Sequence, residues 1–145
     1  MAHWSEVCHT TKEIFSRKII RNEAPAAKVF EDEYSLAFMD VMPQVPGHTL
    51  VIPKSPAENI HEIEPEALAH TVRTTQIVSH AVKQAFDAPG IMIAQLNGSA
   101  AGQTVFHLHF HILPRFEGLE FSLHAREMQE MDLLKDHAER IKTFL

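Results

Sequence analysis

Cysteine is nearly absent from this sequence: Cys8 stands alone among 145 residues. A single cysteine cannot form a disulfide within the chain, which is typical of a protein from a reducing compartment. No apolar run is long enough to span a membrane, and residues 1–6 lack the charged and apolar regions of a signal peptide. We therefore expect a cytoplasmic protein without a membrane partner.

Basic residues are also scarce. The chain has 13 lysines and arginines against 19 aspartates and glutamates, a net charge of −6. This balance argues against nonspecific binding of nucleic acid, although it allows a locally positive pocket for phosphate. The length and a hydrophobic fraction of 45% suit one domain spanning residues 1–145, with about ten N-terminal residues loose.

Local patterns predict an α+β fold. Thr10 or Thr11 is a candidate cap for a short helix to about Ile20. A long amphipathic helix begins at Pro65 and stops at Pro89-Gly90. Its predicted apolar stripe is Leu68, Val72, Thr75, Val78, Val82 and Phe86. A last helix is expected over 122–144, with the stripe Leu123, Met128, Met131, Leu134, Ala138 and Ile141.

The same patterns predict an antiparallel sheet with the helices on one side. The expected strands are 27–31, 35–41, 48–52, 91–96 and a final strand over 106–112. The first two strands form a hairpin around residues 32–34, and Pro114 ends the last strand because proline cannot donate to a ladder.

The final strand alternates histidine with apolar residues. His107, His109 and His111 would share one face, spaced about 6.6 Å apart, since side chains alternate along a strand. The opposite face would carry the core residues Phe106, Leu108, Phe110 and Ile112. Three interpretations fit this spacing: an ordinary polar strand face, a metal site, or catalysis on phosphate by imidazole.

The residues around the histidines narrow this choice. The run Gly102–Arg115 resembles the signature of the histidine triad (HIT) superfamily of nucleotide hydrolases and transferases. Residues 18–26 resemble its entry segment, and residues 38–54 its second and third strands. The resemblance covers about residues 13–116 and is of the Hint type, with some likeness to the Fhit branch. It implies a five-stranded antiparallel sheet with a long helix packed on it, a C-terminal helix, and a homodimer.

The resemblance also implies catalytic roles. His109 would be the nucleophile that attacks the α-phosphorus of a nucleotide, since a neutral imidazole has the lone pair required. His111 would contact the phosphate and help to protonate the leaving group, and His107 would support the nucleophile. His48 matches the superfamily's additional active-site histidine.

Further positions match nucleotide contacts of the superfamily. Asp40 would accept hydrogen bonds from the ribose hydroxyls. Ile14, Phe15 and Phe38 would form an apolar slot for the base. Asn97, Gln103 and Thr104 would hold phosphate oxygens. The implied partner is a purine nucleotide, and no cofactor is expected.

The sequence departs from the pattern at the zinc site of many bacterial HIT proteins. The two cysteine positions are Glu13 and Ser16, a later histidine is Pro56, and only His107 of the four ligands remains. We therefore expect no metal. Arg17 resembles a one-residue insertion, which affects the alignment of Ile14 and Phe15.

Three functions follow from these observations. The first is a hydrolase or nucleotidyl transferase that cleaves purine nucleoside phosphoramidates, or related conjugates, through a nucleotidyl-histidine intermediate. The second is a dinucleoside polyphosphate hydrolase, suggested by the Fhit-like stretches Pro46-Gly47-His48 and Thr74-Thr75-Gln76. The third is a nucleotide-binding interaction module with little activity.

Overall fold

The computed structural model describes residues 16–120 and 127–145. Residues 16–20 are helical. The elements that follow are β1 (Lys28–Glu31), β2 (Ser35–Met39), β3 (Thr49–Pro53), α2 (Pro65–Ala85), β4 (Gly90–Ala94), the short 3₁₀ helix η1 (Ser99–Ala101), β5 (Phe110–Arg115) and α3 (Met131–Lys142).

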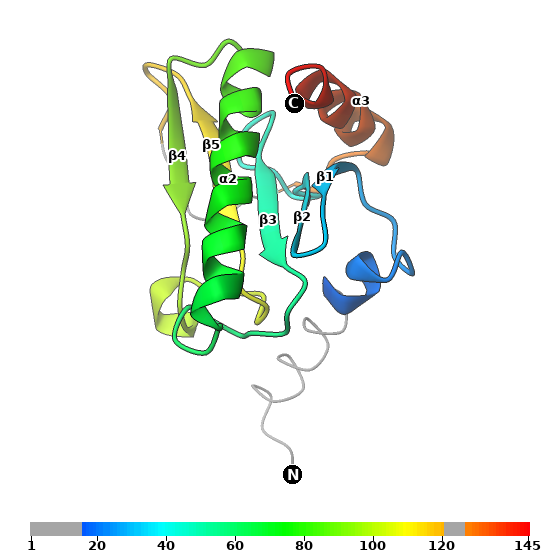
Figure 1. Cartoon of the computed structure of the whole chain (residues 1–145). Coiled ribbons are helices and arrows are strands. Elements are labelled where there is room, and N and C mark those ends of the chain that lie inside the picture. Colours follow the sequence, from blue (N-terminus) through cyan, green and yellow to red (C-terminus); the bar gives the residue numbers. More distant parts are fainter. Residues whose placement is uncertain (1–15, 121–126) are drawn as a thin grey trace.

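The five strands form one antiparallel sheet in the order β1-β2-β3-β5-β4. The long helix α2 lies across the sheet and α3 lies near its β1 end (Figure 1). This is the predicted α+β architecture, so the fold expectation is confirmed. The last strand in the chain, β5, lies between β3 and β4, which brings the histidine segment to the centre of the sheet.

The alternation of side chains divides the sheet into two faces. One face packs on both helices: Val51 of β3 and Ile112 of β5 share a buried cluster with Val78 of α2 and Leu134 of α3. The other face buries Leu36, Phe38 and Ile52 against Ile19. Strand residues that alternate with the helix-facing ones, including His111, therefore point away from α2.

The β1–β2 hairpin is confirmed, and its turn is closed by a side chain. One carboxylate oxygen of Asp32 accepts hydrogen bonds from the backbone N–H groups of Tyr34 and Ser35, both at 2.8 Å. This is an Asx turn, the reason that aspartate favours such positions.

The histidine strand differs from the prediction at both ends. It begins at Phe110, so His107 and His109 precede it, and it continues through Pro114, which pairs with Ile91. The Leu108 N–H donates to the carbonyl of Ala57 in a loop, which takes this segment out of the sheet. Beyond Ile112, β5 has no partner residue in β3, so a proline there interrupts no ladder on that side. The expected burial of Phe106, Leu108, Phe110 and Ile112 is confirmed.

Two helix predictions were wrong in detail. Val72 is 46% exposed, because α2 instead buries threonines whose hydroxyls are bonded internally: Thr71 donates to the Ala67 carbonyl, and Thr75 to the Thr71 carbonyl. Residues 127–130 are not helical, and Met128 is exposed. The Gln129 N–H donates to the Val41 carbonyl, so this segment contacts the residues just after β2 before α3 begins. Leu123 lies outside the described residues.

Candidate active site

A cavity of about 380 Å³ opens on the sheet face opposite α2. Its wall is apolar where the three strands β2, β3 and β5 meet the helical residues 16–20, and polar at the end of β2. The lining residues are Ser16, Ile19, Pro25, Ala26, Phe38, Met39, Asp40, Val41, Met42, Gln44, His48, Leu50, Ile52, Thr104, Val105, His109 and His111. An apolar cavity with a few convergent polar groups is typical of a site for a small molecule.

The apolar part suits a flat ring. Phe38 of β2 lies opposite Leu50 of β3 in the register, and Ile52 is two residues further along β3 on the same face. Ile19 packs on this group. The slot offers area for stacking and apolar contact.

His109 is held by the backbone. Its Nδ1 lies 2.7 Å from the carbonyl oxygen of His107. A carbonyl can only accept, so Nδ1 of His109 carries the proton, and Nε2 of the neutral ring carries a lone pair. Burial lowers the pKa of His109, although the bond to the His107 carbonyl opposes this shift. The ring is therefore neutral at pH 7.

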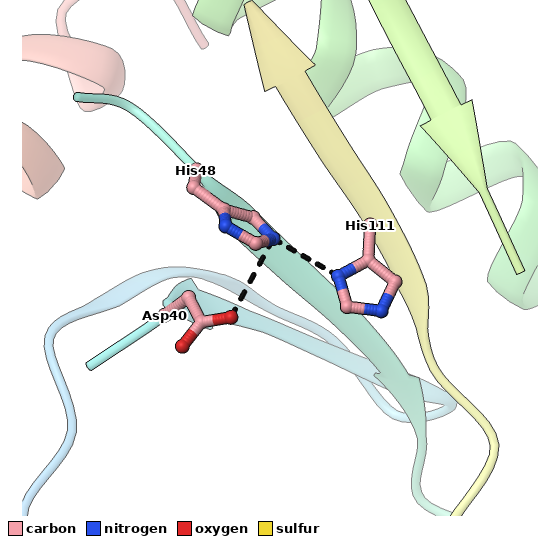
Figure 2. A group of neighbouring side chains, drawn as sticks. All are labelled: Asp40, His48 and His111. Carbon is pink, nitrogen blue, oxygen red and sulfur yellow. Dashed lines mark hydrogen bonds and ion pairs between the residues drawn. The ribbon is translucent and has the colours of Figure 1, made fainter. Parts of the chain in front are cut away.

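His48 and His111 form a second hydrogen-bonded unit. The Gln44 N–H donates to Nδ1 of His48 (3.1 Å), so the proton of neutral His48 is on Nε2. That nitrogen lies 2.9 Å from Nδ1 of His111 and 3.5 Å from a carboxylate oxygen of Asp40 (Figure 2). His48 thus donates to His111, which leaves the His111 proton on its own Nε2.

The pKa values of these two rings favour the neutral forms. Burial, followed by the charges of His111 and His109, lowers the pKa of His48 to about 3. Burial, followed by the charge of His109, lowers the pKa of His111 to about 4. The contact between His48 and Asp40 is therefore a neutral N–H facing a carboxylate at pH 7, and no ion pair forms there.

Asp40 is the acidic group of the site. Burial raises its pKa to about 6, while the bond that one oxygen accepts from the Met42 N–H (2.8 Å) acts in the opposite direction. Its carboxylate is mostly ionised at pH 7 although it is largely buried. Burying a charge costs free energy unless further hydrogen-bond donors reach it. A ligand hydroxyl can supply such a donor.

The structure brings together six of the predicted site residues and separates three. Around the cavity lie Phe38, Asp40, His48, Thr104, His109 and His111. His107, Asn97 and Gln103 do not line it, and Ile14 and Phe15 lie outside the described residues.

The side-chain amides of Asn97 and Gln103 form hydrogen bonds with neighbouring loop residues. Asn97 accepts from the Ile60 N–H (2.8 Å) and exchanges hydrogen bonds with the Gln95 side chain. Gln103 accepts from the Gly98 N–H and donates to the carbonyls of Glu58 and Val105. Both side chains therefore fix the shape of the loop that carries Thr104 into the cavity.

His107 faces the other way from His109. Its ring is 2% exposed, and its Nε2 donates to the Pro53 carbonyl (2.8 Å). The ring borders a smaller, separate cavity of about 250 Å³ with Lys54 and Pro56. The backbone carbonyl of His107, and not its ring, accepts the hydrogen bond from His109. The strand pattern gave no reason to expect this contact.

Asp40, His48 and His111 offer ligand atoms within 4.8 Å of one another, which raises the possibility of a metal ion. The hydrogen bonds argue against one. A cation on Nε2 of His48 would move the ring proton to Nδ1, where it would face the Gln44 N–H. The three side chains fit a hydrogen-bonded chain better than a metal centre, whose histidine ligands need an unprotonated nitrogen.

The arrangement gives two neighbouring imidazoles opposite roles. The His109 and His111 ring centroids are 4.8 Å apart; the first presents a lone pair and the second an N–H. Such a pair can attack an electrophile and donate a hydrogen bond to the group that leaves it. The polar residue that sequence reasoning missed is Gln44, whose contribution to this chain comes from its backbone and leaves no side-chain signal.

Comparison with known proteins identifies the family of this chain. The HIT domain family model matches residues 21–118. Protein hit of Bacillus subtilis is 37% identical over 130 residues, covering 86% of this chain and 90% of that protein. Adenylylsulfatase HINT3 of Arabidopsis thaliana is 38% identical over 100 residues, covering 69% of this chain and 51% of that protein. A solved Hit-like protein involved in cell-cycle regulation from Bartonella henselae superposes with a TM-score of 0.84 at 45% identity, covering 91% and 95% of the two chains.

Proposed function

The chain belongs to the HIT domain family, and on that premise we propose that it hydrolyses nucleotide conjugates at the α-phosphate through a nucleotidyl-histidine intermediate. The observation that carries the proposal is a pair of hydrogen bonds beside one cavity, from Nδ1 of His109 to the His107 carbonyl and between Nδ1 of His111 and Nε2 of His48, which gives the two rings different tautomers. The adenylylsulfatase among its relatives supports an adenylyl conjugate as the class of substrate, and purine nucleoside phosphoramidates are the substrates we favour.

In the first step, Nε2 of His109 attacks the α-phosphorus. A P–N bond to His109 forms while the bond from phosphorus to the leaving group breaks. The Nε2–H of His111 donates a hydrogen bond to the leaving nitrogen, which takes a proton from water and departs as the amine, and the ring N–H of His48 on Nδ1 of His111 holds His111 in the orientation for this contact. Covalent catalysis of this kind divides one difficult displacement into two easier ones.

In the second step, water attacks the same phosphorus. The P–N bond to His109 breaks, the nucleoside monophosphate leaves, and the proton released by the attacking water neutralises the hydroxide left by the first step. His109 and His48 keep their starting tautomers, because the His107 carbonyl and the Gln44 N–H continue to dictate which nitrogen of each ring carries hydrogen. Thr104 lines the cavity, and we assign it the role of a donor to a phosphate oxygen.

The nucleoside would occupy the rest of the cavity. Its base fits the slot of Phe38, Leu50 and Ile52, and its ribose lies against Asp40. The buried carboxylate gains hydroxyl donors when the ribose binds, so its desolvation cost is offset. The apolar slot contributes affinity for the base through buried area and stacking.

A turnover panel tests the function. Adenosine 5′-phosphoramidate, a diadenosine polyphosphate and adenylylated lysine would be supplied at equal concentration, with AMP release measured by chromatography. We expect the phosphoramidate to be the best substrate. Preference for the diadenosine polyphosphate would favour the Fhit-like alternative, and nucleotide binding without turnover would favour an interaction module.

We also propose that the protein is a homodimer. Two features of the described residues support this: β4 is an edge strand of the sheet, and Ile93 on it is 45% exposed, as Val72 on α2 is 46% exposed. Unpaired edges with apolar residues favour association. Light scattering of the wild type and of Ile93→Lys tests this proposal, with the variant expected to shift toward the monomer.

A further inference from the structure

One buried side-chain atom near the reacting histidines has no hydrogen-bond partner. It is Oε1 of Gln44, and no other buried side-chain nitrogen or oxygen in residues 16–120 and 127–145 lacks a partner. Gln44 also lines the cavity. A buried polar atom without a partner costs stability, so its presence in a ligand cavity points to a partner that arrives with the ligand.

The backbone of Gln44 is held by hydrogen bonds, whereas its carboxamide oxygen has no partner. Its backbone N–H donates to the ring Nδ1 of His48, and the backbone N–H of His48 donates to the carbonyl of Val45 (3.1 Å). Pro43 and Pro46 flank the turn and restrict its backbone further. The terminal torsion of a glutamine side chain has broad minima, so turning the carboxamide toward a ligand has a small torsional cost.

The position of Gln44 decides which part of a nucleotide it meets. The Asp40 N–H donates to the His48 carbonyl (3.0 Å), so Asp40 and His48 lie side by side at one end of the β2–β3 pair. The base slot runs from there toward Leu50 and Ile52. Gln44 lies in the turn between β2 and β3, where its backbone N–H binds Nδ1 of His48, and it lines the cavity together with Asp40.

We propose that the Gln44 carboxamide oxygen is a second ribose acceptor beside Asp40, and that this residue makes the site selective for ribonucleotides over deoxyribonucleotides. The inference rests on the proposed function, because it takes the ligand to be a nucleoside phosphate. Asp40 already accepts from the Met42 N–H and faces the His48 N–H. A cis-diol brings two donors, and the buried side-chain acceptor without a partner among the described residues of this cavity is Oε1 of Gln44.

The proposal predicts opposite effects on the free and the bound protein. In Gln44→Met, an apolar chain of similar length replaces the unpartnered oxygen, so the ligand-free protein should melt at the same temperature as the wild type or higher. The same variant should bind AMP roughly tenfold more weakly, because one hydrogen bond to a ribose hydroxyl is lost. A purely structural role would lower the melting temperature instead.

The test measures Kd by calorimetry for AMP, 2′-deoxy-AMP and 3′-deoxy-AMP, with the wild type, Gln44→Met and the control Gln84→Met, an exposed glutamine in the last turn of α2. We expect Gln44→Met to weaken AMP binding and to leave the Kd for one of the two deoxynucleotides within about twofold of the wild type. Gln84→Met should match the wild type throughout.

Two results would overturn the proposal. One is an equal loss of affinity for all three ligands, and the other is unchanged binding of AMP by Gln44→Met. A wild type that binds AMP but hydrolyses no conjugate would refute the proposed reaction alone, since the binding comparison still decides the role of Gln44. A wild type that binds no AMP would overturn both.

Discussion

The ring of Phe86, at the C-terminal end of α2, packs directly against Gly47. A Cβ atom on Gly47 would lie 2.9 Å from two ring carbons of Phe86 and 3.1 Å from Pro114. The backbone of Gly47 also has φ +93°, a conformation that residues with a side chain adopt at a cost. Arg140 of α3 lies over the Phe86 ring, with its guanidinium carbon 4.7 Å from the ring centroid. The turn before His48 thus packs against Phe86 at the end of α2, and Phe86 in turn contacts Arg140 of α3.

Gly47→Ala should therefore destabilise the fold by about 2–4 kcal/mol, from overpacking against Phe86 and from the positive φ. Urea denaturation measures the change. Gly90→Ala is the matched control, because a Cβ there meets no atom within 4 Å and the φ of Gly90 lies outside the left-handed region. If both substitutions cost the same, the close packing of Phe86 on Gly47 would have no energetic consequence.

Asp40→Asn should stabilise the ligand-free protein at pH 7. The folded-state pKa of Asp40 is raised to about 6, so the carboxylate is harder to ionise in the fold than in the unfolded chain, and above pH 6 this opposes folding. Removing the charge should increase the free energy of unfolding by about 1–3 kcal/mol at pH 7. The gain should shrink below pH 6 and be nearly absent at pH 4, as urea titrations at the three pH values would show.

The neighbouring substitution Asp40→Ala tests the ribose contact. It should weaken AMP binding by about 1–3 kcal/mol, because buried hydroxyls lose a charged acceptor. The loss should be smaller for the 2′,3′-dideoxy analogue. Calorimetry that gave equal losses for both ligands would show that Asp40 does not bind the ribose.

The sequence predicted the elements and six of the residues that line the cavity, but not the different contacts that the histidines make. Strand periodicity placed His107 beside His109, whereas the bond from the Leu108 N–H to the Ala57 carbonyl takes this segment out of the sheet and turns the His107 ring to Pro53. The contacts that decide the tautomers come from backbone groups of His107 and Gln44. Every residue carries such groups, so no sequence pattern can reveal them.

The low pKa values of His48 and His111 predict acid sensitivity. Their folded-state pKa values are lowered to about 3 and 4, so below about pH 6.5 the unfolded chain binds protons that the fold excludes. Stability contributed by these rings is present above pH 6.5 and is lost as the pH falls toward 4. The pKa of Asp40 shifts in the opposite direction, but the effect of this one group on stability is opposed by that of two histidines.

We therefore expect the urea midpoint to fall between pH 7 and pH 5. In His111→Asn the fall of the urea midpoint should be smaller, because the unfolded chain then has one histidine fewer that binds a proton excluded by the fold. NMR titration of the wild type should show both rings neutral at pH 5. A resonance of His111 that titrates near pH 6.5 would contradict the buried, neutral pair.

Stoichiometric zinc should be absent from the protein. Ser16 and Pro56 stand at two positions where the resemblance calls for ligands, and Nε2 of His107 is bonded to the Pro53 carbonyl. At the second candidate cluster, the Gln44 N–H keeps the proton of His48 on the nitrogen that would face the ion. Elemental analysis of untagged protein checks this, and one zinc per chain after dialysis would refute it.

His109→Ala should abolish nearly all turnover while nucleotide binding persists. The substitution removes the lone pair on Nε2, but the base slot at Phe38 and the carboxylate of Asp40 remain. Without the imidazole, water must attack a phosphorus ringed by anionic oxygens directly, without the advantage of a nucleophile held at a fixed distance. Acid-quenched mass spectrometry of the wild type should show a nucleotidyl adduct on the peptide containing His109. Turnover by His109→Ala within about tenfold of the wild type, a barrier difference of only about 1.4 kcal/mol, would exclude His109 as the nucleophile.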